Sequence, residues 1–417
     1  MRIRSAAAAA VLVVGASLLG APQAVAVDDA VALTATFNDP AGSSAQQDAI
    51  RNQLISLINR TPAGAEINGS VYLFTDGGVS GALVAAKQRG VKVKLVVDGD
   101  AVADVDANGK ATGSEYSMLA AATGLGTDLT ADSWVLACPA NRGCVGNRAL
   151  GGSGGTGAIN HNKFFLFSMA GSTDNVVFQT SANLTTSQRR NLFNNAVTIP
   201  DAGSGLYASY RAYWQDLVSS GSSGPGLATY YKTQDAGAYK TYFFPRQEKA
   251  GATFDNDPGT DTVVSLLNNV DCAGGATRIR IGMYAFTRVQ IADKLVALKR
   301  AGCGVELLHD GEEGNLGSAV RASIAGNLTY AARCAGTAVD GSGASRSIGI
   351  HSKYLLIEGT YLGGANRKLV FTGSHNYTFP NLRANDETLL KIDNAAVYDA
   401  FRANFESIES GPHCSAW

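Results

Sequence analysis

A long internal repeat is the feature of this chain that most constrains its fold. One half slid against the other at a constant offset of 212 residues aligns six identical pairs in one register. The pairs are Ile67 with Ile279, Tyr72 with Tyr284, Phe74 with Phe286, Lys87 with Lys299, Gly90 with Gly302 and Asp98 with Asp310. Further along, the offset falls to 190 and then becomes 193, so the halves share elements and differ by loop insertions. The repeat predicts two similar domains.

Both halves carry the same polar triplets. A His-x-Lys follows a glycine-rich stretch and opens an apolar run, and a Ser-x-Asn comes after it. The triplets are His161-Asn162-Lys163 and Ser181-Ala182-Asn183 in the first half, and His351-Ser352-Lys353 and Ser374-His375-Asn376 in the second. The chain has only five histidines, and two of them occupy equivalent places in the repeat. Coincidence is the weaker explanation.

Hydrophobic patterning predicts the same element order in each half: helix, strand, helix, strand, long loop, strand, strand, helix. The expected ranges are 45–59, 66–75, 79–89, 91–98, 163–168, 176–180 and 206–218, then 261–269, 277–286, 289–301, 304–310, 353–357, 369–372 and 395–409. Alternating strands and helices predict an α/β fold with helices on both faces of a mixed or parallel sheet. The apolar content of 45% is ample for two cores.

Composition predicts the domain limits and the compartment. Residues 1–26 have a basic start, a short apolar stretch and an Ala24-Val25-Ala26 ending, which is typical of a signal peptide. A membrane anchor is the alternative, but the stretch falls short of the roughly 20 residues that a span needs. A Ser/Gly-rich stretch begins at Ser219. We therefore expect a secreted protein with a signal peptide at 1–26, a first lobe at 27–218, a linker at 219–241 and a second lobe at 242–417.

Six cysteines in an exported chain predict disulfides rather than a metal site, since no C-x-x-C spacing is present. Cys138 and Cys144 bracket a short loop and are the easiest pair. Cys272 and Cys303 each precede a predicted strand, and parallel neighbouring strands would bring them together. Cys334 and Cys414 remain by elimination.

The repeated triplets predict a phosphate site. Side chains alternate along a strand, so the histidine and lysine of each His-x-Lys project from one face. If the halves pack about a pseudo-twofold axis, one cavity collects two imidazoles, two ammonium groups and two amides. Cleavage of a phosphodiester needs a nucleophile, a proton for the leaving oxygen and positive charge at the phosphoryl oxygens. Two histidines and two lysines supply all three, so we expect no metal and no cofactor.

These residues resemble the phospholipase D superfamily, whose signature H-x-K-x-x-x-x-D followed by G-S-x-N occurs twice per chain. The resemblance covers nearly all of the chain after residue 26. It implies a phospholipase D-like fold, with two α/β sandwich lobes related by a pseudo-twofold axis, one shared active site and a phosphohistidine intermediate. It makes His161 the nucleophile and His351 the general acid and base. It also implies that phosphate is bound by Lys163, Lys353, Asn183 and Asn376, with Ser181 and Ser374 beside them.

The chain departs from the signature at two places. The acidic end of the first motif is Ser168 and that of the second is Glu358, where the family has aspartate. Since this position mainly supports structure, glutamate is the milder change. The acidic residue that orients a histidine is present as Glu387 in the second half, but Asn194 occupies its place in the first. We expect the first half to orient His161 differently or to be weakened.

The leading hypothesis is a secreted phospholipase D, acting as a monomer on phospholipid at a membrane or micelle surface to give phosphatidic acid and a free head group. Its phosphohistidine would also allow transfer to an alcohol. A nuclease of the same superfamily is the first alternative. Removal of residues 1–26 leaves a formal charge of −3, which argues against a nucleic-acid partner. The second alternative is a non-catalytic protein that binds phosphorylated ligands, favoured only by Ser168 and Asn194.

Overall fold

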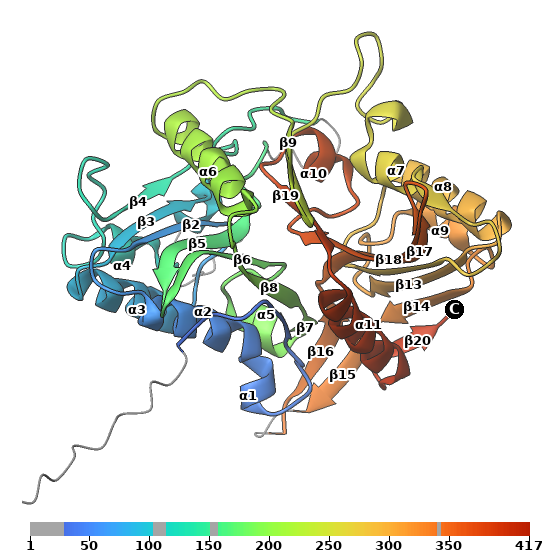
Figure 1. Cartoon of the computed structure of the whole chain (residues 1–417), viewed down its shortest axis with the longest axis horizontal. Coiled ribbons are helices and arrows are strands. Elements are labelled where there is room, and N and C mark those ends of the chain that lie inside the picture. Colours follow the sequence, from blue (N-terminus) through green and yellow to red (C-terminus); the bar gives the residue numbers. More distant parts are fainter. Residues whose placement is uncertain (1–28, 103–113, 151–156, 340–342) are drawn as a thin grey trace, which may run out of the picture.

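The computed structural model describes residues 29–102, 114–150, 157–339 and 343–417. The predicted signal peptide lies outside the described residues. Two mixed β-sheets lie side by side, one in the first half of the chain and one in the second, with helices around both (Figure 1). We call each sheet with its helices a lobe.

The sheet of the first lobe has the strand order β1-β8-β6-β5-β2-β3-β4. Its strands are β1 (Thr34–Phe37), β2 (Glu66–Val71), β3 (Lys92–Val97), β4 (Trp134–Ala137), β5 (Lys163–Ala170), β6 (Thr173–Thr180) and β8 (Asn195–Pro200). The helical segments of this lobe are α1 (Ser44–Gln47), α2 (Ala49–Arg60), α3 (Gly77–Gln88), η1 (Gly99–Val102), α4 (Tyr116–Ala120), α5 (Thr186–Arg190) and α6 (Leu206–Ser222).

The sheet of the second lobe has the order β20-β14-β13-β12-β17-β18-β19-β10-β9, with β11 added beside β17. Its strands are β9 (Lys232–Ala236), β10 (Tyr239–Phe243), β11 (Val270–Asp271), β12 (Arg278–Met283), β13 (Gly304–Asp310), β14 (Tyr330–Cys334), β17 (Lys353–Tyr361), β18 (Gly364–Gly373), β19 (Thr388–Asp393) and β20 (Cys414–Ala416). Its helical segments are η2 (Pro258–Thr260), α7 (Thr262–Leu267), α8 (Val289–Arg300), α9 (Ser318–Ile324), α10 (Phe379–Arg383) and α11 (Ala395–Ser410).

The two sheets repeat one pairing scheme. In the first, β2 pairs parallel with β3 and antiparallel with β5, which continues antiparallel to β6 and β8. In the second, β12 pairs parallel with β13 and antiparallel with β17, which continues antiparallel to β18 and β19. The α/β fold class and the two-lobed architecture predicted from the sequence are confirmed.

Alternation along the strands explains why each sheet is covered on both faces. On β5, Phe165 and Phe167 join a buried cluster with α2 and α3, whereas Phe164 and Leu166 join a different cluster with α6. On β17, Leu355 and Ile357 face α7, α8 and α9, and Leu356 packs with α11.

Helices α6 and α11 lie between the lobes and share one apolar core (Figure 1). On α6, Tyr213 stacks on Phe243 of β10, with ring centroids 4.2 Å apart. On α11, Phe401 makes an edge contact with Phe37 of β1, at 4.9 Å. Each helix therefore packs on its own sheet and on a strand of the other lobe. Aromatic contacts of this kind fix the relative position of the lobes.

Backbone pairing also joins the lobes beside the repeated motifs. A third sheet has the order β15-β16-β7, with β15 (Gly336–Val339) and β16 (Ser345–Ile350) from the second lobe and β7 (Leu192–Phe193) from the first. On the opposite side, Asn160 forms a bridge with Asp386. The segments that lead into the two His-x-Lys triplets are thus each paired with the other lobe.

Several elements were not predicted from the sequence. Strands β8 and β19 follow the Ser-x-Asn triplets closely, with α5 and β7 between in the first lobe and α10 in the second. The segment 219–241, predicted as a linker, contains the end of α6, all of β9 and the start of β10. Strand β9 is mostly exposed and polar, so its sequence lacks the apolar alternation of a core strand. The domain limits themselves stay a prediction.

The structure contains three disulfides: Cys138–Cys144, Cys272–Cys303 and Cys334–Cys414. These are the pairs that the sequence predicts. Cys303 immediately precedes β13, which runs parallel to β12. Among the described residues, no helix is both long enough and apolar enough to cross a membrane.

We predict that the Cys272→Ser/Cys303→Ser variant loses more stability than the Cys138→Ser/Cys144→Ser variant. The first bond closes a loop with a sequence separation of 31, the second one of 6. Chain-entropy arguments give about 3–4 kcal/mol for the first bond and about 2 kcal/mol for the second. Thermal midpoints of the two double variants test this order. A larger drop for the Cys138/Cys144 variant would contradict it.

Candidate active site

The two His-x-Lys triplets meet at the boundary between the lobes. Lys163 begins β5 opposite Val71, and Lys353 begins β17 opposite Met283. All four side chains are buried: His161 is 7% exposed, His351 4%, Lys163 2% and Lys353 1%. Each lysine Nζ donates to the carbonyl of the histidine two residues earlier, at 2.6 Å in the first lobe and 2.7 Å in the second. The structure therefore brings the four residues together as the sequence predicts.

The side chain that orients His161 comes from the other lobe. Its Nδ1 lies 2.8 Å from Oε1 and 3.1 Å from Oε2 of Glu387, which is fully buried. Asn381 and Ser374 also donate hydrogen bonds to this carboxyl group. With Nδ1 bound in this way, the other ring nitrogen, Nε2, remains for chemistry. Glu387 was expected to serve the histidine of its own lobe; instead its contact crosses to the first lobe.

His351 of the second lobe is in turn oriented by a side chain of the first lobe. Its Nδ1 lies 3.1 Å from Oδ1 of Asn194, a residue of the first lobe. The amide orientation is fixed, because Nδ2 of Asn194 donates to the carbonyls of Gln188 and Leu192, at 3.1 Å each. The side chain of Asn194 therefore presents its acceptor oxygen to Nδ1 of His351, while Nζ of Lys353 lies 3.0 Å from the same nitrogen and 3.2 Å from Nε2. His161 thus has a carboxyl partner and His351 an amide partner.

The two motif serines support these orienting groups. Ser181 donates through Oγ to Oδ1 of Asn194 at 3.0 Å, and the Ser374 hydroxyl donates to Glu387. Both serines are fully buried. We expected these hydroxyls beside the phosphate, but the geometry commits them to Asn194 and Glu387.

The two motif asparagines differ from each other. Asn376 accepts a long hydrogen bond of 3.4 Å from the backbone N–H of Ala285. Asn183 is 8% exposed, and its Oδ1 has no hydrogen-bond partner within the described part of the chain. Its amide is therefore the less committed of the two and is the better placed to bind a ligand.

The repeated aromatic and acidic pairs also belong to the site. The Tyr72 ring lies 5.2 Å from that of His161, and the Tyr284 ring 4.4 Å from that of His351. Asp98 accepts the backbone N–H of Asn160 at 2.5 Å, and Asp310 accepts that of Ile350 at 3.0 Å. Each aspartate thus fixes the residue before a motif histidine.

The two residues at the acidic end of the motifs, Ser168 and Glu358, make contacts that do not involve the histidines. Ser168 accepts the backbone N–H of Glu66 at 2.8 Å. Glu358 accepts a 3.2 Å hydrogen bond from Tyr398 and lies 3.7 Å from Arg280. Both contacts hold strands and helices together, so neither change weakens the site directly.

Burial dominates the charge state of the site. Removal from water lowers the pKa of His161 and of His351, and the nearby lysines lower both further. Burial also lowers the pKa of Lys163 to about 7, with Glu387 opposing the shift. The pKa of Glu387 rises to about 8 for the same reason, and Lys163 opposes that rise. An anion bound between the lysines would favour their charged forms. Among the residues described, no three or more His, Cys, Asp or Glu side chains form a group that could hold a metal ion.

Comparison with known families identifies the fold and the motifs together. Residues 54–217 and 267–409 match the family described as cardiolipin synthase, PLD-like domain. The chain belongs to this family. The two matched ranges contain both His-x-Lys triplets, so the PLD-like domain is duplicated. The chain is accordingly an enzyme of the phospholipase D superfamily with phosphodiesterase chemistry.

Individual relatives are more distant. The chain is 26% identical to the mitochondrial cardiolipin hydrolase of Chlamydomonas reinhardtii over 205 residues, which is 46% of this chain and 82% of that protein. Phosphatidylserine synthase of Haemophilus influenzae has a similar structure, with a TM-score of 0.54, 13% identity and coverage of 92% of this chain and 87% of that one. Polyphosphate kinase of Porphyromonas gingivalis gives a TM-score of 0.53 and 13% identity over 91% of this chain, which spans about half of that protein. The structural likenesses support the PLD-like fold alone.

Asn381 is a site residue that the sequence analysis missed. Its Nδ2 lies 3.3 Å from Nδ1 of His161, and it also donates to Glu387. It stands 193 residues after Gln188, the same offset that relates the Ser-x-Asn triplets. Extending the repeat past those triplets would have revealed it.

We predict that, as pH rises, kcat/KM falls at a lower pH than kcat does. In the free enzyme the Lys163 ammonium is present below its pKa of about 7 and lost above it. Since kcat/KM reports free-enzyme groups, it should fall as pH rises through about 7. Bound phosphate raises the pKa of this lysine, so kcat should fall only at higher pH. Initial rates at limiting and saturating substrate between pH 5 and 10 measure both profiles. Superimposable alkaline limbs would refute this role for Lys163.

Proposed function

We propose that this chain is a phospholipase D. It cleaves the phosphodiester on the head-group side of a glycerophospholipid, giving phosphatidic acid and a free alcohol. The observation that carries the proposal is the cross-lobe contact of Glu387 with Nδ1 of His161, at 2.8 Å, beside two buried lysines.

The first step uses both histidines. Nε2 of His161 attacks phosphorus, and the bond between phosphorus and the head-group oxygen breaks. His351, protonated on Nε2, donates that proton to the departing oxygen, so the head group leaves as a neutral hydroxyl. The positive charge that develops on the His161 ring favours ionisation of the adjacent Glu387 carboxyl group, and the resulting carboxylate stabilises that charge. At Nδ1, His351 faces the amide oxygen of Asn194 and the ammonium of Lys353 rather than a carboxylate, so a positive charge on its ring is less stabilised and a proton leaves more readily.

The second step returns the enzyme to its starting state. Neutral His351 takes a proton from water, whose oxygen attacks phosphorus. The bond between phosphorus and Nε2 of His161 breaks, and phosphatidic acid is released. Lys163 and Lys353 balance the charge of the phosphoryl oxygens in both steps. Asn183 and Asn376 complete the binding of these oxygens.

The charge states of the two histidines in the free enzyme are consistent with this order of steps. The pKa of His161 lies well below its ordinary value because of burial, so its ring is neutral and nucleophilic at neutral pH. The pKa of His351 is lowered by burial and then by Lys353. A bound phosphate offsets the lysine charge and supports protonation of His351 at the moment when an acid is needed.

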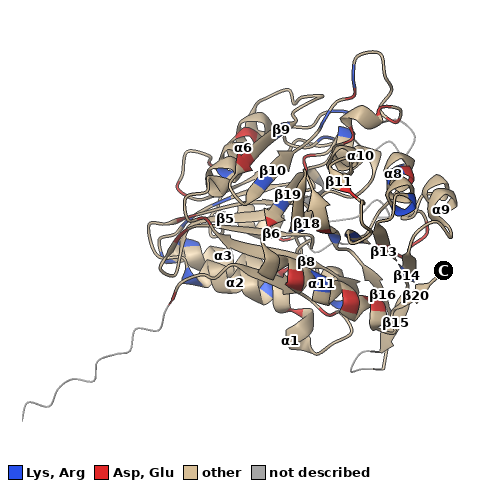
Figure 2. Cartoon of the chain, turned by 45° about the vertical axis from the view of Figure 1, so that its right-hand side comes forward, with Lys and Arg blue, Asp and Glu red and all other residues tan. Residues whose placement is uncertain are grey.

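Three further observations favour an exported lipid enzyme. The relative from Chlamydomonas reinhardtii is named a cardiolipin hydrolase. In the view of Figure 2, Lys and Arg residues are interspersed with Asp and Glu over both lobes, unlike the basic face of a nucleic-acid-binding protein. Three disulfides suit an oxidising compartment such as the extracellular space.

We predict that the enzyme transfers the phosphatidyl group to ethanol. A phosphohistidine partitions between water and any small alcohol that enters the site, whereas direct attack by water gives hydrolysis alone. Phosphatidylcholine and ethanol, incubated with the chain lacking residues 1–26, should give phosphatidylethanol, measured by mass spectrometry. The His161→Ala variant serves as the control and should give neither product.

Two results would overturn the proposal in different ways. Phosphatidic acid without phosphatidylethanol at high ethanol would exclude an alcohol-accessible intermediate. No lipid product, with plasmid DNA cleaved in a parallel tube, would favour the nuclease.

A further inference from the structure

A cavity of about 610 Å³ lies one side chain away from His351. Its lining includes Tyr284, whose ring is 4.4 Å from that of His351, and Gly349, two residues before that histidine. Both lobes contribute, because Gln188 and Asn191 come from the first lobe. Tyr284 therefore connects the cavity to the histidine that protonates the leaving group in the proposed mechanism.

The lining of this cavity is acidic. Asp310 and Glu312 are the charged residues among those that line it, and no lysine, arginine or histidine does. Asp310 is buried and already accepts the backbone N–H groups of Ile350 and Glu312. Glu312 is exposed, and Tyr284 donates to its Oε2 at 3.0 Å. This bond holds one carboxylate at the cavity, next to an aromatic ring.

Gln188 gives an independent indication of a ligand. It lines the cavity, it is 7% exposed, and its Oε1 accepts no hydrogen bond within the described residues. Its counterpart in the second lobe, Asn381, is engaged by Glu387 and His161. A buried acceptor without a partner is costly unless a ligand or water supplies a donor. The cavity thus offers acceptors and negative charge to its occupant.

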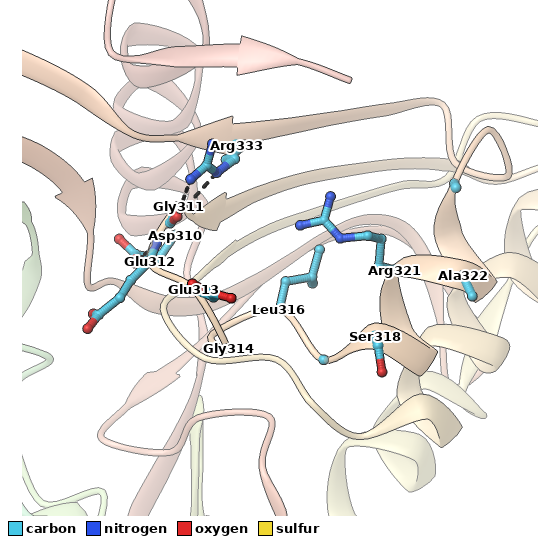
Figure 3. Close-up of a pocket in the computed structure, with 12 residues that line it drawn as sticks. Asp310, Gly311, Glu312, Glu313, Gly314, Leu316, Ser318, Arg321, Ala322 and Arg333 are labelled. Carbon is cyan, nitrogen blue, oxygen red and sulfur yellow. Dashed lines mark hydrogen bonds between the residues drawn. The ribbon is translucent and has the colours of Figure 1, made fainter.

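The loop after β13 separates this cavity from a second one. Figure 3 shows that second cavity, where Arg333 donates to the carbonyl of Gly311. In the same view the side chains of Glu312 and Glu313 point to opposite sides of the loop. Glu313 lines the second cavity but not the one near His351. It therefore provides a matched control for Glu312.

We propose that the cavity near His351 is the subsite for the alcohol that leaves or enters, and that Glu312 makes it select alcohols bearing a positive charge. The inference rests on the proposed function, since it places the leaving oxygen next to His351. In-line attack by His161 expels the alcohol towards His351, and Tyr284, which contacts the His351 ring, lines this cavity. A cationic head group there meets the carboxylate of Glu312, whereas an anionic one meets repulsion from Glu312 and Asp310.

The test uses two acceptor alcohols of nearly equal shape. Choline carries a quaternary ammonium, and 3,3-dimethyl-1-butanol has a neutral carbon in its place. Both compete at equal concentration for one phosphatidyl-enzyme formed from phosphatidylglycerol, and the ratio of the two transfer products is measured by mass spectrometry. Only the incoming alcohol differs, so the ratio reports the subsite and not the lipid surface.

We expect the wild-type enzyme to prefer choline about 5- to 10-fold and the Glu312→Gln variant to lose at least two thirds of this preference. The effect is modest because Glu312 is exposed and screened by solvent. Glu313→Gln should keep both the wild-type ratio and, within about twofold, the wild-type rate of hydrolysis of phosphatidylglycerol.

The outcomes separate the two proposals. Equal transfer to both alcohols by the wild type, or a preference for choline unchanged in Glu312→Gln, would overturn the subsite while leaving the phospholipase D function intact. An equal loss in Glu313→Gln would reduce the effect to general surface charge and would also overturn it. Absence of any transfer or hydrolysis product in the wild type would count against the proposed function itself.

Discussion

The hydrogen bonds that cross between the lobes at the two histidines are the interaction on which the rest of the site depends. Glu387 of the second lobe contacts His161 of the first, and Asn194 of the first contacts His351 of the second. The backbone repeats the exchange, because His161 N donates to Asp386 O and His351 N to Phe193 O. Neither lobe holds a complete histidine site. The duplicated fold thus yields one site rather than two.

The charged groups of this shared site are buried, and this burial favours the binding of an anion. Two lysines, two histidines and a glutamate lie almost entirely out of water at the boundary between the lobes. Such groups are costly to bury unless opposite charge or hydrogen bonds compensate them. Glu387 compensates part of the cost, and a phosphate between the lysines would compensate more. In the free enzyme the burial of these groups is only partly compensated, and it therefore lowers the pKa values of both lysines and both histidines.

Local patterns predicted much of this structure, and contacts between distant segments account for what they missed. The alignment of the two halves predicts equivalent positions for Tyr72 and Tyr284 and for Asp98 and Asp310. In the structure the members of each pair make equivalent contacts. The alternation of strands predicted that His-x-Lys would present both side chains together. By contrast, Glu387 and His161 are 226 residues apart, and nothing in the local sequence indicates that this pairing crosses lobes. The sequence also does not indicate that the hydroxyl groups of Ser181 and Ser374 donate to buried side chains, so it predicts them beside the phosphate instead.

The central claim is that Glu387 sets the protonation of His161 across the boundary between the lobes. The direct measurement is the ¹⁵N spectrum of the imidazole rings in histidine-labelled enzyme, wild type and Glu387→Gln, since only five histidines need assignment. Thermal midpoints of both proteins check that the variant is folded, and Asn194→Ala provides the reciprocal case. We predict that Glu387→Gln changes the tautomer or pKa of His161 and leaves His351 unchanged, whereas Asn194→Ala does the reverse. A Glu387→Gln spectrum in which His351 shifts and His161 does not would contradict the account.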